Sequence, residues 1–393
     1  MPDSLFNLFT KEYSADPFLY YKQIRESHPV CEIVPGGIWL ISRYEDVKFA
    51  LQRHDIFSSE GNTQILQPEW LKRHYLPKYI LAEDPPIHNY HRSILPRLFF
   101  DKVIDELKPT MQQEASLLIA AMKENPAPEL LSDFSHPYFG KIAQLLTGLD
   151  DKDIQYAYNW ITLFMHLPEQ PSEGFLVHLD NTYECFQEVL LKAATSTKKP
   201  RTQLQQLLQR NIKENKQTLE QACATLEIII FGLCSTPVNF MSHLYINLSN
   251  YPHVKARLDR DKTLIPAFIE ESLRFDNSEH ILVRTTTTAI ERSNTTIPAG
   301  AITYLLLASA NRDPEQFENP DLFNIHRDTR SHLGFGYGPH HCIGMKLLRT
   351  AGQIAIETLL AEFQEIDCSD NQAKPWSHSL TSHNVNKIPM ILE

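Results

Sequence analysis

The 393-residue sequence lacks several features that would assign it to a specialised class. Its net charge is −11, from 37 basic and 48 acidic side chains, which argues against a general nucleic-acid binder. Its six cysteines contain no CxxC pair and no zinc-type spacing, so we expect reduced thiols in a cytoplasmic protein rather than a disulfide framework. No G-x-S-x-G motif accompanies the 17 histidines, which disfavours a Ser/His hydrolase.

Long hydrophobic runs are also scarce. The first 18 residues carry charges among their apolar side chains, so neither a signal peptide nor a membrane span is predicted there. The most apolar stretch, 226–234, is much shorter than the roughly 20 residues that a bilayer requires. With 42% hydrophobic and 22% charged residues, the composition is typical of a soluble globular protein without membrane or nucleic-acid partners. Because no repeat or linker is visible, we expect a single domain over 1–393.

Local patterns predict a mainly α protein with small β-sheets. Helical patterning dominates as far as residue 274, and helices are predicted over 16–26, 44–53, 88–100, 102–125 and 345–362. Strands are predicted over 30–34, 38–42, 283–288, 302–307 and 387–392. A capping-box pattern at Thr218 and Gln221 predicts a long helix towards residue 250, which Pro237 should distort. Residues 58–86 are expected to form a long functional loop.

The most informative segment is the glycine-rich run 334–344, G-F-G-Y-G-P-H-H-C-I-G, which precedes a predicted helix. Its four glycines allow the backbone to bend sharply and to approach a flat group closely. Cys342 would lie at the helix start, where free N–H groups and the helix dipole favour a thiolate, a good ligand for iron. The alternatives are a buried structural cysteine, a phosphate loop, or a zinc site with His340 and His341, although adjacent side chains point apart.

This segment resembles the cysteine-ligand loop of the cytochrome P450 family, the haem-thiolate monooxygenases. The family pattern F-G-x-G-x-H-x-C-x-G is matched at Phe335, Gly336, Gly338, His340, Cys342 and Gly344. The resemblance implies the cytochrome P450 fold and haem b (iron protoporphyrin IX) as cofactor, with Cys342 as the iron ligand. It also implies that Phe335, Gly336, His340 and Gly344 contact the haem.

A second match, Glu271 and Arg274, corresponds to the family's E-x-x-R pair. Two such residues usually form only a solvated surface pair, but their place before the cysteine loop implies a structural role near the haem. The arginine that completes this group in the family is replaced here by Leu322, and Arg327 is a candidate substitute.

A third match concerns the haem propionates. His88 and Arg92 are four residues apart on one predicted helix face and could both reach an anion, although such a pair is more often an ordinary surface feature. The resemblance implies that this anion is a haem propionate, and that Arg284 and His340 are further propionate partners. Carboxylates beside an apolar plane require such charge-assisted hydrogen bonds.

A fourth match is the run F-G-L-C-S-T at 231–236, which resembles the family's oxygen-binding helix. The resemblance implies that Gly232 makes room for O2, and that an acid followed by an alcohol relays protons. Here Cys234 occupies the acid position, where a thiol is a poor relay at neutral pH, and Ser235 occupies the alcohol position. A shift of one residue would make Thr236 the alcohol, and bulky Phe231 should narrow the pocket.

The resemblance implies an enzyme that oxidises a small organic substrate, with a role in secondary metabolism. O2 and electrons from a ferredoxin-type donor and its reductase would drive the reaction, because the chain is too short for its own flavin or iron–sulfur module. Substrate contacts are expected from the 58–80 loop and from Phe231, Ile281, Leu282 and Ser382. A basic face for the electron donor is expected at Arg97, Lys102 and Lys346.

The altered pair at Cys234 and Ser235 leaves two alternatives open. One is an atypical member of the family that performs oxidative coupling or cyclisation. The other is a catalytically altered haem-binding protein.

Overall fold

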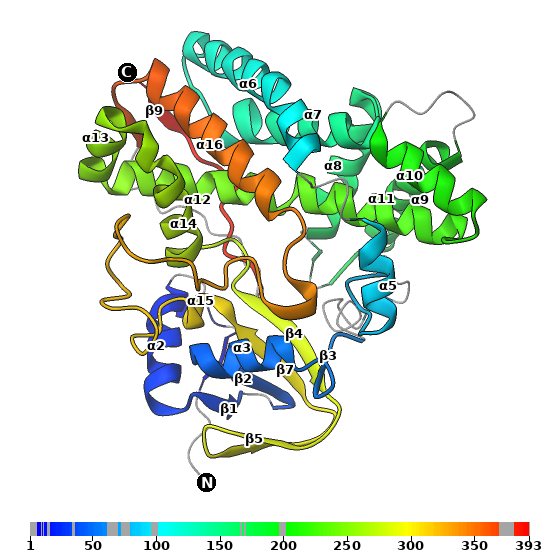
Figure 1. Ribbon diagram of the computed structural model, residues 1–393, viewed down its shortest axis with the longest axis vertical. Helices are drawn as coiled ribbons and strands as arrows, with labels where there is room; N and C mark the ends of the chain where they lie inside the picture. The colour runs from blue at the N-terminus through cyan, green and yellow to red at the C-terminus, as the bar shows by residue number, and fades with distance from the viewer. Residues whose placement is uncertain are drawn as a thin grey trace.

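The computed structural model describes residues 6–8, 10, 12–13, 16–33, 36–60, 70–71, 79–95, 101–165, 167–168, 170–195, 202–368 and 381–392. Figure 1 shows a helical part at the top and a smaller sheet part at the bottom, with the loop that precedes α16 between them. This is a mainly α protein with small sheets, as the sequence predicts.

The sheet part is built around five strands in the order β1-β2-β7-β4-β3. Their bounds are β1 (Val30–Glu32), β2 (Ile38–Ile41), β3 (Phe57–Ser58), β4 (Ile281–Thr286) and β7 (Ile302–Leu306). β2 and β7 are parallel, whereas the other pairs are antiparallel, and Leu282 lies opposite Leu305. Two hairpins lie outside this sheet, one formed by β5 (Ile290–Arg292) and β6 (Thr295–Ile297), the other by β8 (Ile366–Cys368) and β9 (Met390–Leu392).

The two faces of the sheet are buried by different helices, because successive side chains of a strand alternate between faces. One face packs with α3 (Tyr44–Gln52) and carries Leu282. The other packs with α2 (Pro17–Ser27), and it buries Ile281 and Val283. The short helix α15 (Leu307–Ala310) follows β7 directly.

The helical part encloses the largest apolar core. Its helices are α5 (Ile87–Ile94), α6 (Asp101–Glu124), α7 (His136–Thr147), α8 (Asp151–Met165), α9 (Glu173–Thr195), α10 (Gln203–Lys213), α11 (Leu219–Cys234), α12 (Thr236–Asn250), α13 (Pro252–Arg260), α14 (Ile265–Phe275) and α16 (Met345–Glu362). Shorter turns are η2 (Leu131–Ser135), η3 (Lys262–Leu264) and η4 (Gly338–His340). α16 packs against α6 and α14, and α11 packs against α7 and α9.

The long central helix begins and bends where the sequence predicts. Thr218 and Gln221 form the capping box that starts α11. The helix breaks at Ser235 (φ −113°, ψ −84°), because Pro237 has no N–H with which to bond the carbonyl four residues earlier. The apolar stretch is longer than predicted: by length and composition the helix Leu219–Asn250 could cross a membrane, since an 18-residue window within it has a mean hydropathy of 1.5. Its packing against α7, α9 and α14 is that of a core helix.

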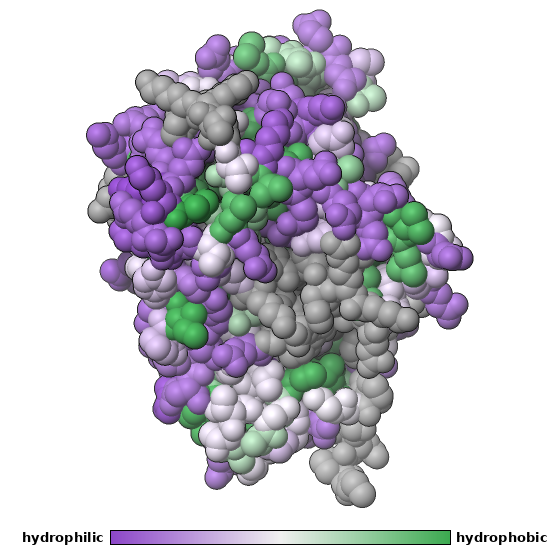
Figure 2. All heavy atoms as spheres, turned by 90° about the vertical axis from the view of Figure 1, so that its right-hand side faces the viewer, coloured by the Kyte–Doolittle hydropathy of each residue, from purple (hydrophilic) through white to green (hydrophobic). Residues whose placement is uncertain are grey.

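Most other predicted elements lie within a few residues of their expected bounds, and the prediction for 345–362 matches α16. The short strands β3, β5, β6 and β8 were not predicted. Residues 96–100 of the predicted 88–100 helix, and 61–69 and 72–78 of the long loop, lie outside the described residues. Figure 2 shows hydrophilic side chains over much of one face of the molecule, with hydrophobic ones in separate patches.

Candidate active site

Cys342 lies between η4 and the first turn of α16. Its backbone N–H donates to the carbonyl of Phe335 at 2.9 Å, which closes the glycine-rich loop. Its sulfur accepts hydrogen bonds from the backbone N–H groups of Gly344 and Met345. Burial raises the pKa of the thiol, whereas these bonds and the nearby Arg92 oppose that increase. The two backbone N–H groups and the charge of Arg92 therefore favour an ionised sulfur, against the burial that disfavours it.

The shape of this loop requires glycine at two positions. Gly336 and Gly338 have φ values of +69° and +71°, in the left-handed region that L side chains rarely adopt. A Cβ atom added at Gly338 would lie 2.4 Å from the carbonyl oxygen of Leu51. Because that neighbour is backbone, α3 and the loop could not pack this closely with any larger residue.

A polar network that includes side chains of α14 and α16 holds the cysteine loop in place. The Arg349 guanidinium donates to the carboxylate of Glu270 at 2.5 and 2.7 Å, and His332 Nε2 lies 3.0 Å from the same carboxylate. His332 Nδ1 accepts from the N–H of Gly334 at 3.0 Å. Burial alone would raise the pKa of Glu270, but the bonds from Arg349 and His332 lower it to about 2. Glu270 is therefore ionised at neutral pH and ties α14 and α16 to the loop.

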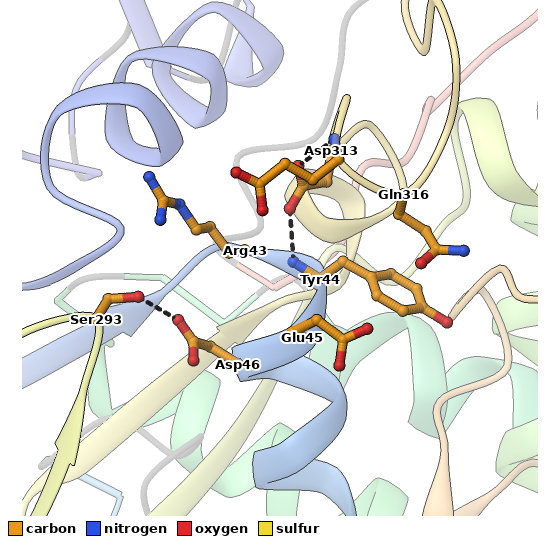
Figure 3. A pocket seen from close by; sticks show the side chains of 8 residues that line it. Arg43, Tyr44, Glu45, Asp46, Ser293, Asp313 and Gln316 are labelled. Atoms are coloured by element: carbon orange, nitrogen blue, oxygen red, sulfur yellow. Dashed lines mark hydrogen bonds between the residues drawn. The ribbon is translucent and has the colours of Figure 1, made fainter.

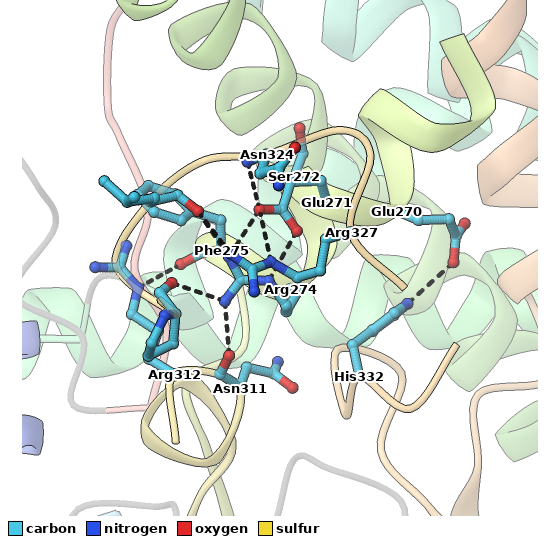
Figure 4. Close-up of polar contacts among 12 residues, drawn as sticks. Glu270, Glu271, Ser272, Arg274, Phe275, Asn311, Arg312, Asn324, Arg327 and His332 are labelled. Carbon is cyan, nitrogen blue, oxygen red and sulfur yellow. Dashed lines mark hydrogen bonds and ion pairs between the residues drawn. The ribbon is translucent and has the colours of Figure 1, made fainter. Parts of the chain in front are cut away.

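Glu271 and Arg274 form a fully buried pair rather than a surface one (Figure 4). Two guanidinium nitrogens donate to the two carboxylate oxygens at 2.8 Å each. Arg274 also donates to the carbonyls of Asn311 and Pro320, at 2.8 and 2.9 Å. The pair therefore fixes the segment that leads from α15 to the cysteine loop.

The structure also locates the two residues considered for the third member of this group. The Leu322 side chain is exposed, whereas Arg327 Nε lies 3.5 Å from Glu271 Oε1. Arg327 donates further hydrogen bonds to the carbonyls of Asn319 and Leu322. An arginine five residues later therefore comes within ion-pair distance of Glu271.

The four residues expected to hold propionates converge from α5, β4 and the loop. The rings of His88 and His340 lie 4.0 Å apart, and burial lowers the pKa of His340 to about 2. Arg284 is buried and donates to the carbonyl of Val283 at 2.7 Å, and Arg92 donates to that of His341. Burial lowers the pKa of Arg284 to about 10.

These four groups fit an anionic cofactor. Among the described residues, neither guanidinium forms an ion pair with a carboxylate, and His88 Nε2 is buried with no hydrogen-bond partner. Nearby Asp84 accepts instead from Ser59 N–H and the Ser58 hydroxyl. A buried guanidinium without an acidic partner, such as that of Arg284, is costly, so this cradle fits the two carboxylates of a haem.

The helix breaks at Ser235, the residue expected to supply the relay hydroxyl, directly after Cys234 at the acid position. Cys234 is 2% exposed and is hydrogen-bonded to Tyr158 of α8 in the helical core. Burial raises the pKa of this thiol to about 12, so it does not ionise at neutral pH. The Thr236 hydroxyl, in contrast, donates to the carboxylate of Glu279, two residues before β4, at 3.5 Å. Beside Gly232, an added Cβ would meet no described atom within 4 Å, whereas Phe231 packs against the main core.

Glu279 also belongs to this region, although no sequence pattern indicates it. Its carboxylate accepts from the Thr236 hydroxyl at 3.5 Å and from the Ser382 hydroxyl at 3.3 Å. Glu279 precedes the β4 strand that carries Leu282 and Arg284, but neither contact involves residues close in sequence. No sequence motif could therefore have identified it.

The expected substrate contacts are distributed unevenly. Leu282 approaches the loop, with its Cδ1 3.7 Å from the position of an added Cβ on Gly336. Ser382 lies beside Glu279. Ile281, however, is 2% exposed and packs with Tyr21 on the opposite face of the sheet. Its expected role disagrees with this geometry, because alternation along the strand turns it away from Leu282.

A cluster of histidines surrounds Asp276 at the end of α14. His280 Nε2 and His383 Nδ1 lie 3.2 and 3.0 Å from Asp276 Oδ1, and His243 Nδ1 lies 3.6 Å from Oδ2. His243 Nε2 donates to the carbonyl of His383 at 2.8 Å. These contacts join α12, the end of α14 and the C-terminal segment close to Glu279.

The expected basic face is only partly described, because Arg97 lies outside the described residues. Lys102 is exposed at the start of α6, and Lys346 lies in the first turn of α16. Lys346 therefore belongs to the helix whose first turn binds the Cys342 sulfur.

A separate polar recess of about 240 Å³ lies near the start of α3 (Figure 3). Its groups satisfy one another: Tyr44 N–H donates to Asp313 at 2.8 Å, and the Ser293 hydroxyl donates to Asp46 at 2.5 Å. These bonds cap α3 and hold the β5–β6 hairpin, so the recess has a structural explanation.

The comparisons with known proteins agree with this geometry. A family model described as Cytochrome P450 matches residues 177–389, more than half of the chain. Cytochrome P450 107B1 of Saccharopolyspora erythraea is 28% identical, over 99% of this chain and 98% of its own length. Cytochrome P450 monooxygenase PikC of Streptomyces venezuelae is 28% identical, over 89% and 84%. The structure of cytochrome P450 CYP109Q5 from Chondromyces apiculatus superposes with a TM-score of 0.86 at 25% identity, covering 98% of both chains.

Proposed function

The chain belongs to the cytochrome P450 family, and on this premise we propose that it is a monooxygenase in which Cys342 binds the iron of haem b. Proteins of this family are haem-containing oxidoreductases that use O2, an organic substrate and a redox partner. The haem supplies the oxygen chemistry when bound, whereas the protein holds the reactants and controls protons. The curated relatives span nearly the same length, which supports one domain over 1–393.

The observation that carries this proposal is the environment of the Cys342 sulfur. The sulfur accepts hydrogen bonds from two backbone N–H groups at the start of α16, and it lies near Arg92. Phe335, Gly336 and Gly344 would face one side of the haem. Gly336 supports this role because its left-handed backbone lets the loop turn without placing a side chain there. The electron-rich sulfur is the ligand that favours cleavage of the O–O bond.

The buried cradle would fix the orientation of the haem. His88, Arg92, Arg284 and His340 would donate to its propionates, which removes the cost of burying these groups without acidic partners. Glu271 and Arg274 would act only on the fold, because their hydrogen bonds are all used within the segment that leads to the loop.

The opposite side would be formed by the break between α11 and α12. We assign the pocket hydroxyl to Thr236 rather than Ser235, because the Thr236 hydroxyl is hydrogen-bonded to Glu279, which precedes β4. Gly232 would leave room for O2, and Phe231, Leu282 and Ser382 would border the substrate. Cys234 would take no part in the relay, since its thiol is hydrogen-bonded to Tyr158. Ile281 would not contact the substrate, since it is buried in the core on the other face of the sheet.

Two electrons would come from a ferredoxin-type donor and its reductase in the cytoplasm, with Lys346 and Lys102 near the docking face. Both lysines lie on helix starts, and the sulfur is bound by the same turn as Lys346. We also propose that this protein has a role in secondary metabolism.

Turnover under isotopically labelled O2 tests this function. Small molecules are first screened for spectral shifts of the haem, and those that bind are then incubated with NADPH, ferredoxin and ferredoxin reductase. A monooxygenase incorporates one labelled oxygen atom into the product. A product lacking the label would support oxidative coupling or cyclisation, which the missing acid at Cys234 favours. Haem binding with no NADPH-dependent turnover would identify a catalytically altered haem protein.

A comparison of two variants tests the assignment of the hydroxyl. We expect Thr236→Val to lower the product formed per NADPH, whereas Ser235→Ala should change it less than twofold. The opposite result would return the relay to Ser235.

A further inference from the structure

Glu279 joins three segments that are far apart in sequence. Its two carboxylate oxygens accept from Thr236 at the start of α12 and from Ser382 in the C-terminal segment. An isolated antiparallel bridge between Glu279 and Ser382 also fixes the backbone at this point. The carboxylate is partly buried, and its two recorded side-chain partners are both hydroxyl groups.

The charged groups nearby do not neutralise this carboxylate. Among the described residues, Glu279 forms no ion pair. The surrounding histidines, His243, His280 and His383, are directed instead at Asp276. Burial raises the pKa of Glu279 to about 7, although the two hydroxyl groups oppose the increase. A carboxyl of this kind is populated in both its acid and its ionised form near neutral pH.

The neighbouring positions on the central helix supply no carboxyl group. Cys234 is buried against Tyr158, and Ser235 carries only a hydroxyl. Thr236 carries a hydroxyl as well, but that hydroxyl is hydrogen-bonded to the carboxylate of Glu279. On the basis of the proposed function, we propose that Glu279 donates protons to the Thr236 hydroxyl and thereby supplies the carboxyl group that positions 234–236 of the central helix lack.

The proton balance of this step is simple. Monooxygenation reduces O2 with two electrons and two protons, and one oxygen atom leaves as water. In each proton transfer, the Glu279 carboxyl gives its proton to Thr236 Oγ1. At the same time the Thr236 hydroxyl gives its own proton to the side of the pocket where O2 would bind. The carboxylate then recovers a proton from water. Glu279 thus acts through Thr236, and the electrons come from the redox partner.

The Glu279→Gln substitution removes the proton but keeps a side chain of the same shape. With ethoxycoumarin as the oxidation probe and a ferredoxin system as donor, we expect product formation to fall about 100-fold while NADPH consumption continues. Thr236→Val should have a similar effect, and the double variant should lose no more than the stronger single one, because both act on one proton path. Glu279→Asp, which retains an acid, should recover part of the activity.

Glu227→Gln is the matched control. Glu227 is another buried carboxyl, on α11, with its pKa raised to about 8 and Gln187 as partner. Its replacement should leave product per NADPH within twofold of the wild type. If both Glu→Gln variants reduce the yield equally, the effect reflects buried charge in general, and the proposal fails.

A measurement independent of turnover is the infrared difference spectrum of the haem-loaded protein across pH. The acid band assigned by Glu279→Gln should disappear with a midpoint near pH 7. Product per NADPH should fall as pH rises through the same range, because the donor form is lost, and Glu279→Gln should abolish this dependence. This profile also decides the matter in the wild type if the glutamine variant does not fold.

Three results would overturn the inference. They are an unchanged product yield in Glu279→Gln, a Glu279 band that does not titrate between pH 5 and 9 (a window of about two units around 7), and weaker binding of cationic ligands with unchanged coupling. The last would make Glu279 a substrate anchor. Failure of the proposed function is recognised separately in the wild type, which would then lack either the thiolate signature of its haem or NADPH-dependent incorporation of labelled oxygen.

Discussion

The loop around Cys342 and the helix break at Ser235 both bend the chain, but they are held in different ways. The loop is fixed by its own backbone: Cys342 N–H bonds to Phe335, and Gly338 packs on the backbone of α3. The break arises from one missing N–H at Pro237.

What positions the side chains at the break comes from elsewhere in the chain. Thr236 contacts Glu279 through a long hydrogen bond of 3.5 Å, and Ser278 donates to the Thr236 carbonyl at the same distance. The backbone of a short motif therefore sets the shape of the cysteine side, and α3 and α14 hold it in place, whereas the side chains at the break are positioned by tertiary contacts alone. We therefore expect substitutions on the cysteine side to lower the free energy of unfolding, and substitutions at the break to change the product formed per NADPH.

The largest effect is expected from Glu271→Ala. It leaves the Arg274 guanidinium buried without its carboxylate, which should cost about 3–5 kcal/mol in the free energy of unfolding. Urea denaturation of the haem-loaded protein measures this. Leu322→Arg, at an exposed position, is the control and should change stability by less than about 0.5 kcal/mol. A small effect of Glu271→Ala would mean that the cysteine side does not depend on this pair.

Gly338→Ala should come next. A left-handed backbone costs an L residue about 1–2 kcal/mol, and the new Cβ would also meet the Leu51 carbonyl. We therefore expect a loss of at least about 2 kcal/mol, with faster haem loss to apomyoglobin. Gly300→Ala, also at positive φ but with open space around it, should show the backbone cost alone. Equal losses in the two variants would contradict the close packing of loop and helix.

A smaller, pH-dependent effect is expected from Glu270→Gln. The folded-state pKa of Glu270 is about 2, below its ordinary value of 4.5. Its contribution is therefore complete above pH 4.5 and is lost as pH falls towards 2. At pH 7 the variant should be destabilised by about 1–2 kcal/mol, and this difference should narrow below pH 4.5. Exposed Glu365→Gln provides the comparison, and a gap that stays constant with pH would refute the assignment.

The smallest effect is expected from Cys234→Ala on the other side of the site. Because this thiol is turned to Tyr158 and does not ionise near neutral pH, product per NADPH should remain within twofold of the wild type. The lost contacts should cost about 1 kcal/mol of stability. A tenfold fall in product per NADPH would show that Cys234 takes part in proton transfer, and would contradict the difference described between the two sides of the site.

The same contrast explains which features the sequence could predict. The capping box at Thr218, the bend at Pro237 and the helix after Cys342 depend on neighbouring residues, and each lies where expected. Glu279 could not be identified, since its partners lie more than 40 residues away in either direction. The proximity of Arg327 to Glu271 likewise depends on how an irregular segment folds back.

Ile281 illustrates the limit of predicting contacts by position along a strand. It was grouped with Leu282 as a substrate contact, but adjacent strand residues point to opposite faces. Only the register of β4 against β7, with Leu282 opposite Leu305, determines which residue faces the loop. The same alternation places Ile281 with the N-terminal aromatic residues.

The most direct test of the account is the absorption spectrum of the reduced, CO-bound protein, compared between the wild type and Cys342→Ser. A thiolate opposite the CO predicts a strongly red-shifted Soret band in the wild type, and that shift should be absent in the variant. A wild-type protein that stays colourless after hemin is supplied, or a red-shifted band that persists in Cys342→Ser, would contradict the assignment of Cys342 as the iron ligand.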